Sequence, residues 1–350
     1  MWPTVAVTRT CSHCVPAIGV PNVGRTSIIR IWDRFGLLAI VLASWVVFAV
    51  FTEGFVSGFN IFSVGRLVSI AVVIGFSQMV VIGIGQMNLS VGAIGGVVAM
   101  FLGWLMQAGG VPWPLAIALA VLFGAALGGL NGVIIVKTGI NAFIVTLGTA
   151  SVFTGAMFIL TKVEAFRDLP PGFLEFGQIR IMGFISPLVI MMVVVLVLLF
   201  LLYRGTTLGR QMLATGANAR AARVSGVPVA RIITVTHMLS GALAGLAGVM
   251  LVMRIGSAIP SIGTAGGGDW LLPSFAAAAI GGTLLSGGVV NVVGTFIGGL
   301  LLGTIENGLT LLNVPGFWVQ LLTGLVLLIA VMLDRARTVA VDRSRQGAAI

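Results

Sequence analysis

The sequence predicts an all-α polytopic membrane protein with about ten transmembrane helices, and three observations lead to this fold class. Of its 350 residues, 58% are hydrophobic and only 8% are charged, whereas a soluble domain carries about 25% charged residues. No charged residue occurs between positions 67 and 136, a length that holds three spans of about 20 residues each. The basic residues also gather in alternate loops. Together these features exclude the soluble enzyme classes.

Apolar runs and the breaks between them place the spans in order. Breaks at residues 85–90 and 108–114 divide the long uncharged stretch, and residues 162–182 form a mixed-charge external loop. Residues 53–66 are predicted as a polar connection after the first span. The ten spans are expected near residues 36–52, 67–86, 91–107, 114–136, 142–161, 183–203, 232–253, 271–285, 291–312 and 317–333. Residues 1–35 and 334–350 are predicted as a disordered tail and a basic tail on either side of this domain.

The charge distribution orients the chain. With the N-terminus inside, 14 of the 19 lysines and arginines lie in inner segments. Basic residues in short loops mark the cytoplasmic side of a membrane protein. Both termini are therefore predicted to be cytoplasmic. If residues 67–136 held only two spans, the most basic loop would face outside, against this rule.

That loop, residues 203–232 between the sixth and seventh spans, is the most informative stretch of the chain. It contains five arginines and no acidic residue. It is longer than a turn requires and rich in alanine, glycine and arginine. We expect one or two short helices there, presented to a cytoplasmic partner.

A faint internal repeat is also visible. Asn131-Gly132 lies near the end of the fourth span and Asn307-Gly308 near the end of the ninth. Helices five apart run in opposite directions, so two halves related in this way form an inverted repeat, as in many transporters. The alternative is coincidence, because Asn-Gly is a common pair.

Catalytic and nucleotide-binding motifs are absent from the sequence. A phosphate-binding loop needs a Gly-Lys pair, and neither Lys137 nor Lys162 follows a glycine. If ATP drives the protein, another subunit binds the ATP and magnesium. Cys11 and Cys14 flank a histidine, but no second pair exists to complete a metal site. We therefore predict no enzyme activity, metal or cofactor in this chain.

The polar groups within the spans are nearly all neutral. Glu306 is the single ionisable candidate for a transport path, and it could equally be a hydrogen-bonding residue beside Asn307. Neutral donors and acceptors suit an uncharged, hydroxyl-rich solute, although such residues also join helices to one another. Our candidates for the translocation path are Asn88, Ser90, Asn131, Thr146, Thr149, Glu306 and Asn307.

Six segments, in order along about two-thirds of the chain, carry a family resemblance. They are GIGQMNLSVGA (83–93), NGVIIVKTGINAFIVTLGT (131–149), TLGRQMLATGANARAARVSGV (207–227), SGALAGLAGV (240–249), GGTLLSGG (281–288) and GTIENGLTLLNV (303–314). With these segments the chain resembles the permease subunit of bacterial ribose- and xylose-type sugar ABC importers, within the branched-chain amino acid and sugar permease superfamily.

The resemblance implies a homodimer in the bacterial inner membrane. Two cytoplasmic ATPase subunits dock beneath it, and a periplasmic binding protein delivers a small uncharged sugar to a path between the two permease subunits. Residues 207–227 look like the loop that inserts into the ATPase, with Gly216 and Gly226 ending its helices. Its implied coupling residues are Gly209, Arg210, Gly216, Asn218, Ala221, Ala222, Arg223, Ser225 and Gly226.

The sequence departs from this family at several points, and other functions stay open. The family often has aspartate at the position of Asn88, a neutral residue at that of Glu306 and an acid at that of Pro273. The same machinery could carry a polyol, a nucleoside, a branched-chain amino acid or an autoinducer-like signal. An ion-coupled secondary transporter centred on Glu306 is the alternative from another class.

Overall fold

The computed structural model describes residues 27–263 and 270–315, with side chains from residue 36 onward; beyond these it describes residues 317, 318, 320, 321, 324, 325, 328 and 332. The chain divides into a unit of residues 1–36, of which only the start of a helix is described, and a unit of residues 37–350. Cys11, Cys14 and the predicted C-terminal tail lie outside the described residues.

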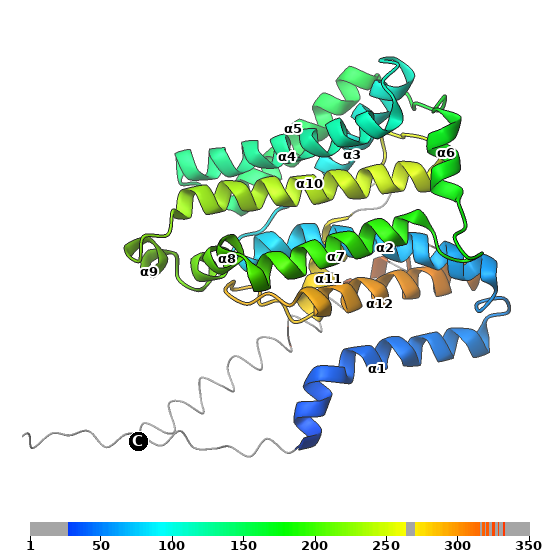
Figure 1. Cartoon of the computed structure of the whole chain (residues 1–350), viewed down its shortest axis with the longest axis horizontal. Coiled ribbons are helices and arrows are strands. Elements are labelled where there is room, and N and C mark those ends of the chain that lie inside the picture. The colour runs from blue at the N-terminus through cyan, green and yellow to red at the C-terminus, as the bar shows by residue number, and fades with distance from the viewer. Residues whose placement is uncertain are drawn as a thin grey trace, which may run out of the picture. The chain divides into compact units, whose positions relative to one another are not determined.

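The described residues form twelve helices, shown in Figure 1. They are α1 (Ser27–Phe51), α2 (Gly58–Gly83), α3 (Val91–Gln107), α4 (Trp113–Thr138), α5 (Ala142–Thr161), α6 (Pro171–Gln178), α7 (Pro187–Gly205), α8 (Thr207–Ala217), α9 (Ala219–Val224), α10 (Val229–Ile255), α11 (Leu271–Ile280) and α12 (Val292–Leu311). The described residues between 317 and 332, in the region of the predicted tenth span, are helical as well.

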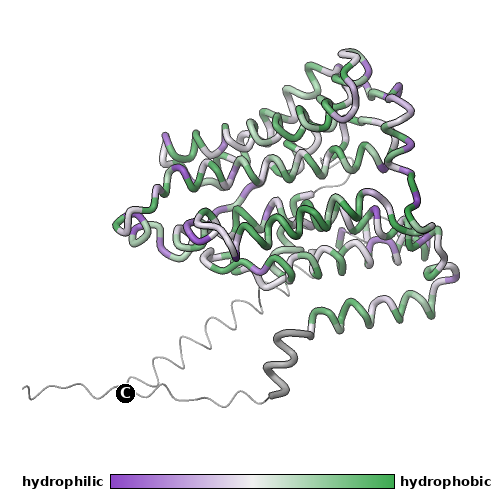
Figure 2. The backbone as a smooth tube through the Cα atoms, in the orientation of Figure 1, coloured by the Kyte–Doolittle hydropathy of each residue, from purple (hydrophilic) through white to green (hydrophobic). Residues whose placement is uncertain are grey.

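Six of these helices are long and apolar enough to cross a membrane, namely α2, α4, α5, α7, α10 and α12. The apolar part of α1, and all of α3 and α11, are shorter apolar helices. Hydrophobic residues run along the whole length of the long helices (Figure 2). The prediction of an all-helical, polytopic membrane protein is confirmed at this level.

The bounds of α3 and α5 are those predicted, whereas α1 and α2 begin earlier. α1 begins at Ser27, within the stretch predicted as a tail. α2 begins at Gly58 because the Ser57 side chain caps it by accepting a hydrogen bond from the Asn60 N–H. The prediction that residues 53–66 form a connection is therefore wrong from Gly58 onward.

Arg66 shows why a charged residue can sit inside α2. Its guanidinium donates to the carbonyl oxygens of Met253 at 3.2 Å and Arg254 at 2.9 Å, at the end of α10. The last carbonyls of a helix attract a cation. In the sequence this charged residue suggests a loop, but in the structure it links two helices.

α2 and α10 form the interior of this bundle. In α2, 83% of the most apolar stretch is buried, and in α10 67%, compared with 22% in both α5 and α7. α4 and α10 approach each other through glycines on both helices, Gly124 and Gly128 on α4 and Gly241 and Gly245 on α10. A Cβ on Gly124 would lie 2.6 Å from the Gly241 carbonyl oxygen. Only glycine allows backbones this close. The exposed faces of α5 and α7 are left for lipid or another protein.

The connecting elements lie at the two ends of the long helices. α8 and α9 are at one end, and α6, within the loop predicted at 162–182, is at the other (Figure 1). α11 ends at Ile280, before the predicted limit of its span at residue 285.

Candidate translocation and coupling sites

The basic loop folds into two short helices because two polar side chains cap them. The Thr206 hydroxyl accepts from the Gly209 N–H at 3.1 Å at the start of α8. The Asn218 side chain accepts from the Ala221 N–H at 2.9 Å and starts α9. Capping of this kind stabilises a helix by about 1 kcal/mol. The predicted short helices are thereby confirmed.

The nine predicted coupling residues divide between surface and interior. Six are exposed: Arg210, Asn218, Ala221, Arg223, Ser225 and Gly226. Gly209 and Ala222 are buried, and Gly216 is partly buried. We call residues 207–226, which include α8 and α9, the elbow; its exposed predicted residues include Arg210 and Arg223.

The two glycines expected to end the elbow helices behave differently. Gly226 has a φ of +83° and follows Ser225, the C-cap residue of α9, so it lies at the end of that helix as predicted. Gly216 lies inside α8, and there the prediction is wrong. A Cβ on Gly216 would collide with the Gly83 carbonyl oxygen at the end of α2 and would lie 2.6 Å from the Gly288 nitrogen. Gly216 is therefore the point where the elbow joins the bundle.

Residues 85–90 form a non-helical break between α2 and α3, and buried amides and hydroxyls hold it. The Gln78 amide, in the orientation that satisfies both its atoms, donates to the Asn88 carbonyl at 2.9 Å and accepts from the Asn88 N–H at 3.3 Å. The Asn88 amide donates to the Ser240 hydroxyl at 2.9 Å. Irregular backbone at membrane depth persists only where protein satisfies it in this way.

Four of the predicted path residues meet at this break. The Ser90 hydroxyl donates to Asn88 Oδ1 at 2.7 Å, and Asn131 donates to Ser90 Oγ at 2.8 Å. The Thr146 hydroxyl accepts from the Leu89 N–H at 3.1 Å. All four predicted residues are fully buried. Their hydrogen bonds link α2, α3, α4 and α5. Joining helices is the alternative role that the sequence indicates for such residues, beside lining a transport path.

The remaining three path candidates lie elsewhere. Thr149 is partly buried, and its hydroxyl donates to the Thr146 carbonyl of its own helix at 3.3 Å. Asn307 is buried and exchanges amide hydrogen bonds with Asn60, at 3.2 and 3.1 Å. Glu306 lies on the exposed side of α12, with Arg254 as its electrostatic neighbour.

The Asn60–Asn307 pair should contribute to stability rather than to transport. We expect Asn307→Leu to lower the free energy of unfolding by roughly 0.6–2 kcal/mol, because one buried amide loses its interhelical partner. The double variant Asn60→Leu with Asn307→Leu should cost less than the sum of the two single variants. Thermal unfolding of the purified protein measures both values, and additive costs would show that the pair is not coupled.

Two cavities lie on either side of the break. One has a volume of about 590 Å³ and its lining includes Leu89, Gly92 and Gly263 together with the hydroxyls Ser151 and Thr154 on α5. We call it the α5 cavity. Binding pockets for small molecules range over about 300–1,000 Å³. The sequence shows Ser151 and Thr154 as neutral intramembrane residues, but nothing in it distinguishes them from hydroxyls that bond only within their helix.

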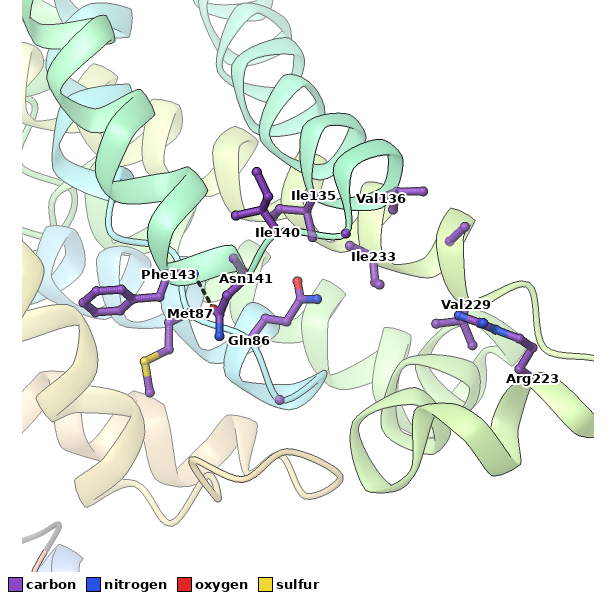
Figure 3. A pocket seen from close by; sticks show the side chains of 14 residues that line it. Gln86, Met87, Ile135, Val136, Ile140, Asn141, Phe143, Arg223, Val229 and Ile233 are labelled. Carbon is purple, nitrogen blue, oxygen red and sulfur yellow. Dashed lines mark hydrogen bonds between the residues drawn. The ribbon is translucent and has the colours of Figure 1, made fainter.

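The second cavity, about 710 Å³, lies beside the elbow (Figure 3). Its walls come from Gln86 and Met87 of the break, the α4–α5 turn, the start of α10 and Arg223 of α9. We call it the elbow cavity. In Figure 3, Arg223 and Val229 lie together on one side of it, with Met87 and Phe143 on the other. Within the described part of the chain, no group of three or more acidic, histidine or cysteine side chains could bind a metal.

Comparison with known proteins shows the family of this chain. Residues 59–331 match the family described as "Branched-chain amino acid transport system / permease component". The chain is 35% identical over 307 residues to the D-allose transport system permease protein AlsC of Escherichia coli, covering 87% of this chain and 92% of that protein. No solved structure matches it.

Two further relatives show the same relationship. The chain is 38% identical over 295 residues to the ribose import permease protein RbsC of Bacillus subtilis, covering 84% of this chain and 90% of that protein. It is 34% identical over 278 residues to the autoinducer 2 import system permease protein LsrD of Yersinia enterocolitica, covering 78% and 82%. The chain therefore belongs to this permease family, as a non-enzymatic permease subunit of the sugar ABC importer type and a multi-pass protein of the inner membrane.

Proposed function

We propose that this chain carries a small uncharged monosaccharide, ribose-like in size and hydroxyl content, across the inner membrane. Its relatives include a ribose import permease and a D-allose transport permease. The α5 cavity supports this choice, because its polar side chains, Ser151 and Thr154, are neutral hydroxyls. Hydroxyls donate to and accept from a sugar.

The elbow is the observation that carries the proposal. It is exposed, basic and built from two capped helices, and at Gly216 it meets the end of α2 directly. A separate cytoplasmic ATPase, which binds the ATP and magnesium, docks on this surface. Its motion passes through Gly216 into the bundle. Arg210, Asn218, Ala221, Arg223, Ser225 and Gly226 are the residues available to it.

The proposal includes ten spans, both termini in the cytoplasm, an inverted repeat and a second copy of the chain. The exposed face of α5, of which only 22% of the apolar stretch is buried, supports the second copy, because the α5 cavity opens beside it. The two copies would close the path between them. A periplasmic binding protein supplies the sugar from the opposite side to the elbow.

The alternative solute is an autoinducer-like signal carried by the same machinery, because the related protein LsrD is an autoinducer 2 import permease. A polyol, a nucleoside or a branched-chain amino acid is the further alternative. Ion-coupled transport through Glu306 has less support, because that side chain lies on the exposed side of α12 and lines neither of the two cavities described above.

Co-purification tests the proposal. The chain is tagged and extracted in mild detergent with its candidate ATPase, as wild type, as Arg223→Glu and as the control Arg204→Glu. Arg204 is also an exposed basic residue, but it stacks on Phe200 of α7, outside the elbow. We expect Arg223→Glu to reduce ATPase recovery at least tenfold, while Arg204→Glu recovers as much as wild type. Equal recovery with all three chains would rule out the elbow as the docking surface.

A further inference from the structure

The linings of the two cavities come within one residue of each other along the chain. Met87 lines the elbow cavity and Leu89 lines the α5 cavity. Asn88 between them is fully buried. At about 3.3 Å per extended residue, the backbone wall from Met87 to Leu89 is only about 7 Å thick.

The positions along α5 agree with such a wall. Ala142 and Phe143 at the start of α5 line the elbow cavity, whereas α5 lines the other cavity from Ala150 onward. Thr146 lies between these two levels and is buried. Its hydroxyl accepts from the Leu89 N–H at 3.1 Å and lies 3.4 Å from the Met87 carbonyl oxygen. The closed part of the route is therefore the place where Thr146 meets residues 87–89.

The other side of this wall is held by α10. Asn88 donates to Ser240 at 2.9 Å, and Gln86 shares a hydrogen bond of 2.9 Å with Nε2 of the buried His237. Ser240 and His237 are three residues apart and so lie on one face of α10. α10 follows the elbow directly, beginning at Val229. A displacement of the elbow would thus act on Gln86 and Asn88, while Thr146 on α5 holds Leu89.

We propose that residues 86–89 are the inner gate of the path, closed in this structure, and that Thr146 is the positioning residue that keeps it closed. The inference rests on the proposed transport function and topology. It assigns the α5 cavity to the outward-facing side and the elbow cavity to the cytoplasmic side. Opening requires the Thr146–Leu89 hydrogen bond to break as α10 moves away from α5. The path is then continuous through both cavities.

Thiol labelling from each side of the membrane tests this gate in the full complex. Cys11 and Cys14 are first replaced by serine, and Met87→Cys and Leu89→Cys are made separately. An impermeant maleimide is added to spheroplasts or to inverted vesicles. We expect Met87→Cys to react from the cytoplasmic face only and Leu89→Cys from the outer face only. If Leu89→Cys reacts from the cytoplasmic face as fast as Met87→Cys, residues 86–89 are not a barrier.

A matched pair of threonines tests the positioning role. Thr146→Val should speed cytoplasmic labelling of Leu89→Cys at least tenfold, because the wall loses its contact with α5. Thr149→Val is the control, since among the described residues its hydroxyl bonds to a carbonyl of its own helix. Thr146→Ser keeps the hydroxyl, so Leu89→Cys in that chain should again react from the outer face only. Equal labelling in the Thr146→Val and Thr149→Val chains, at matched membrane levels, would overturn the assignment to Thr146.

Two exposed positions report the orientation of the chain in the membrane, so that a failure of the gate can be distinguished from a failure of the topology. Val224 on α9 is 86% exposed and Met182 in the loop before α7 is 82% exposed. Val224→Cys should react only from the cytoplasmic face and Met182→Cys only from the outer face. If both reporters behave so and the gate variants do not, the gate fails while the topology stands. Reversed reporters would instead refute the topology and, with it, the sidedness assigned to the two cavities.

Discussion

Replacing Gly241 with valine should abolish folded protein in the membrane. A Cβ at this position would collide with the Gly124 carbonyl oxygen and would lie 2.9 Å from the Gly128 Cα. Overpacking a core normally costs about 1–3 kcal/mol because side chains can change rotamer. Here the obstacle is the backbone of α4, so the two helices must separate along their whole contact. We expect at least a tenfold loss of monodisperse protein after detergent extraction.

Gly205→Val is the matched control for this experiment. Gly205 ends α7, and a Cβ there would meet nothing within 4 Å. Its level and thermal midpoint should therefore stay near those of wild type. Unchanged extraction of Gly241→Val would show that α4 and α10 do not depend on their close approach, contrary to the packing described above.

Gly216→Ala should uncouple transport from ATP hydrolysis while leaving the ATPase bound. The added Cβ would collide with the Gly83 carbonyl oxygen and crowd the Gly288 nitrogen at 2.6 Å. Those two groups also share a hydrogen bond of 3.0 Å, Gly288 N–H donating to Gly83. α8 must therefore move away from α2, although the outward surface of the elbow is unchanged. We expect substrate uptake to fall at least tenfold with ATPase recovery in co-purification kept.

Gly205→Ala is the control for this experiment. Gly205 ends α7 just before the elbow, and in the described part of the chain a Cβ there would meet nothing within 4 Å. Uptake by the Gly205→Ala chain should therefore stay near that of wild type. Uptake measured in the same vesicles as ATP hydrolysis distinguishes the two glycines. Full uptake by the Gly216→Ala chain would mean that force enters the bundle by another contact.

Much of the fold could be predicted because the strongest signals are local. The breaks at residues 85–90 and 108–114 mark α3, and the mixed-charge loop from residue 162 marks the end of α5. Asn218 likewise marks the start of α9 through its capping side chain. The start of α2 could not be predicted, because Arg66 is stabilised by carbonyls from α10, 187 and 188 residues away.

The candidate site was harder to predict because its contacts, like those of Arg66, join residues that are far apart in the sequence. The sequence identifies Asn88, Ser90, Asn131 and Thr146 as neutral polar groups in the membrane. It does not show that Asn131 bonds to Ser90 or that Thr146 bonds to the Leu89 backbone, since these contacts span 41 and 57 residues. Gly216 looks like a helix end in the sequence, and only the approach of α2 reveals it as a packing contact. Ser151 and Thr154 become candidates only when the cavity beside them is seen.

The chemistry of the break also determines how it responds to the membrane potential. The side chains that hold Asn88 and Leu89 are amides and hydroxyls, from Gln78, Ser240 and Thr146. Moving one elementary charge through 100 mV is worth about 2.3 kcal/mol, whereas moving these neutral groups transfers no charge through the field. Rearrangement of these side chains is therefore, in itself, insensitive to voltage, and a depolarised membrane would leave their hydrogen bonds unchanged.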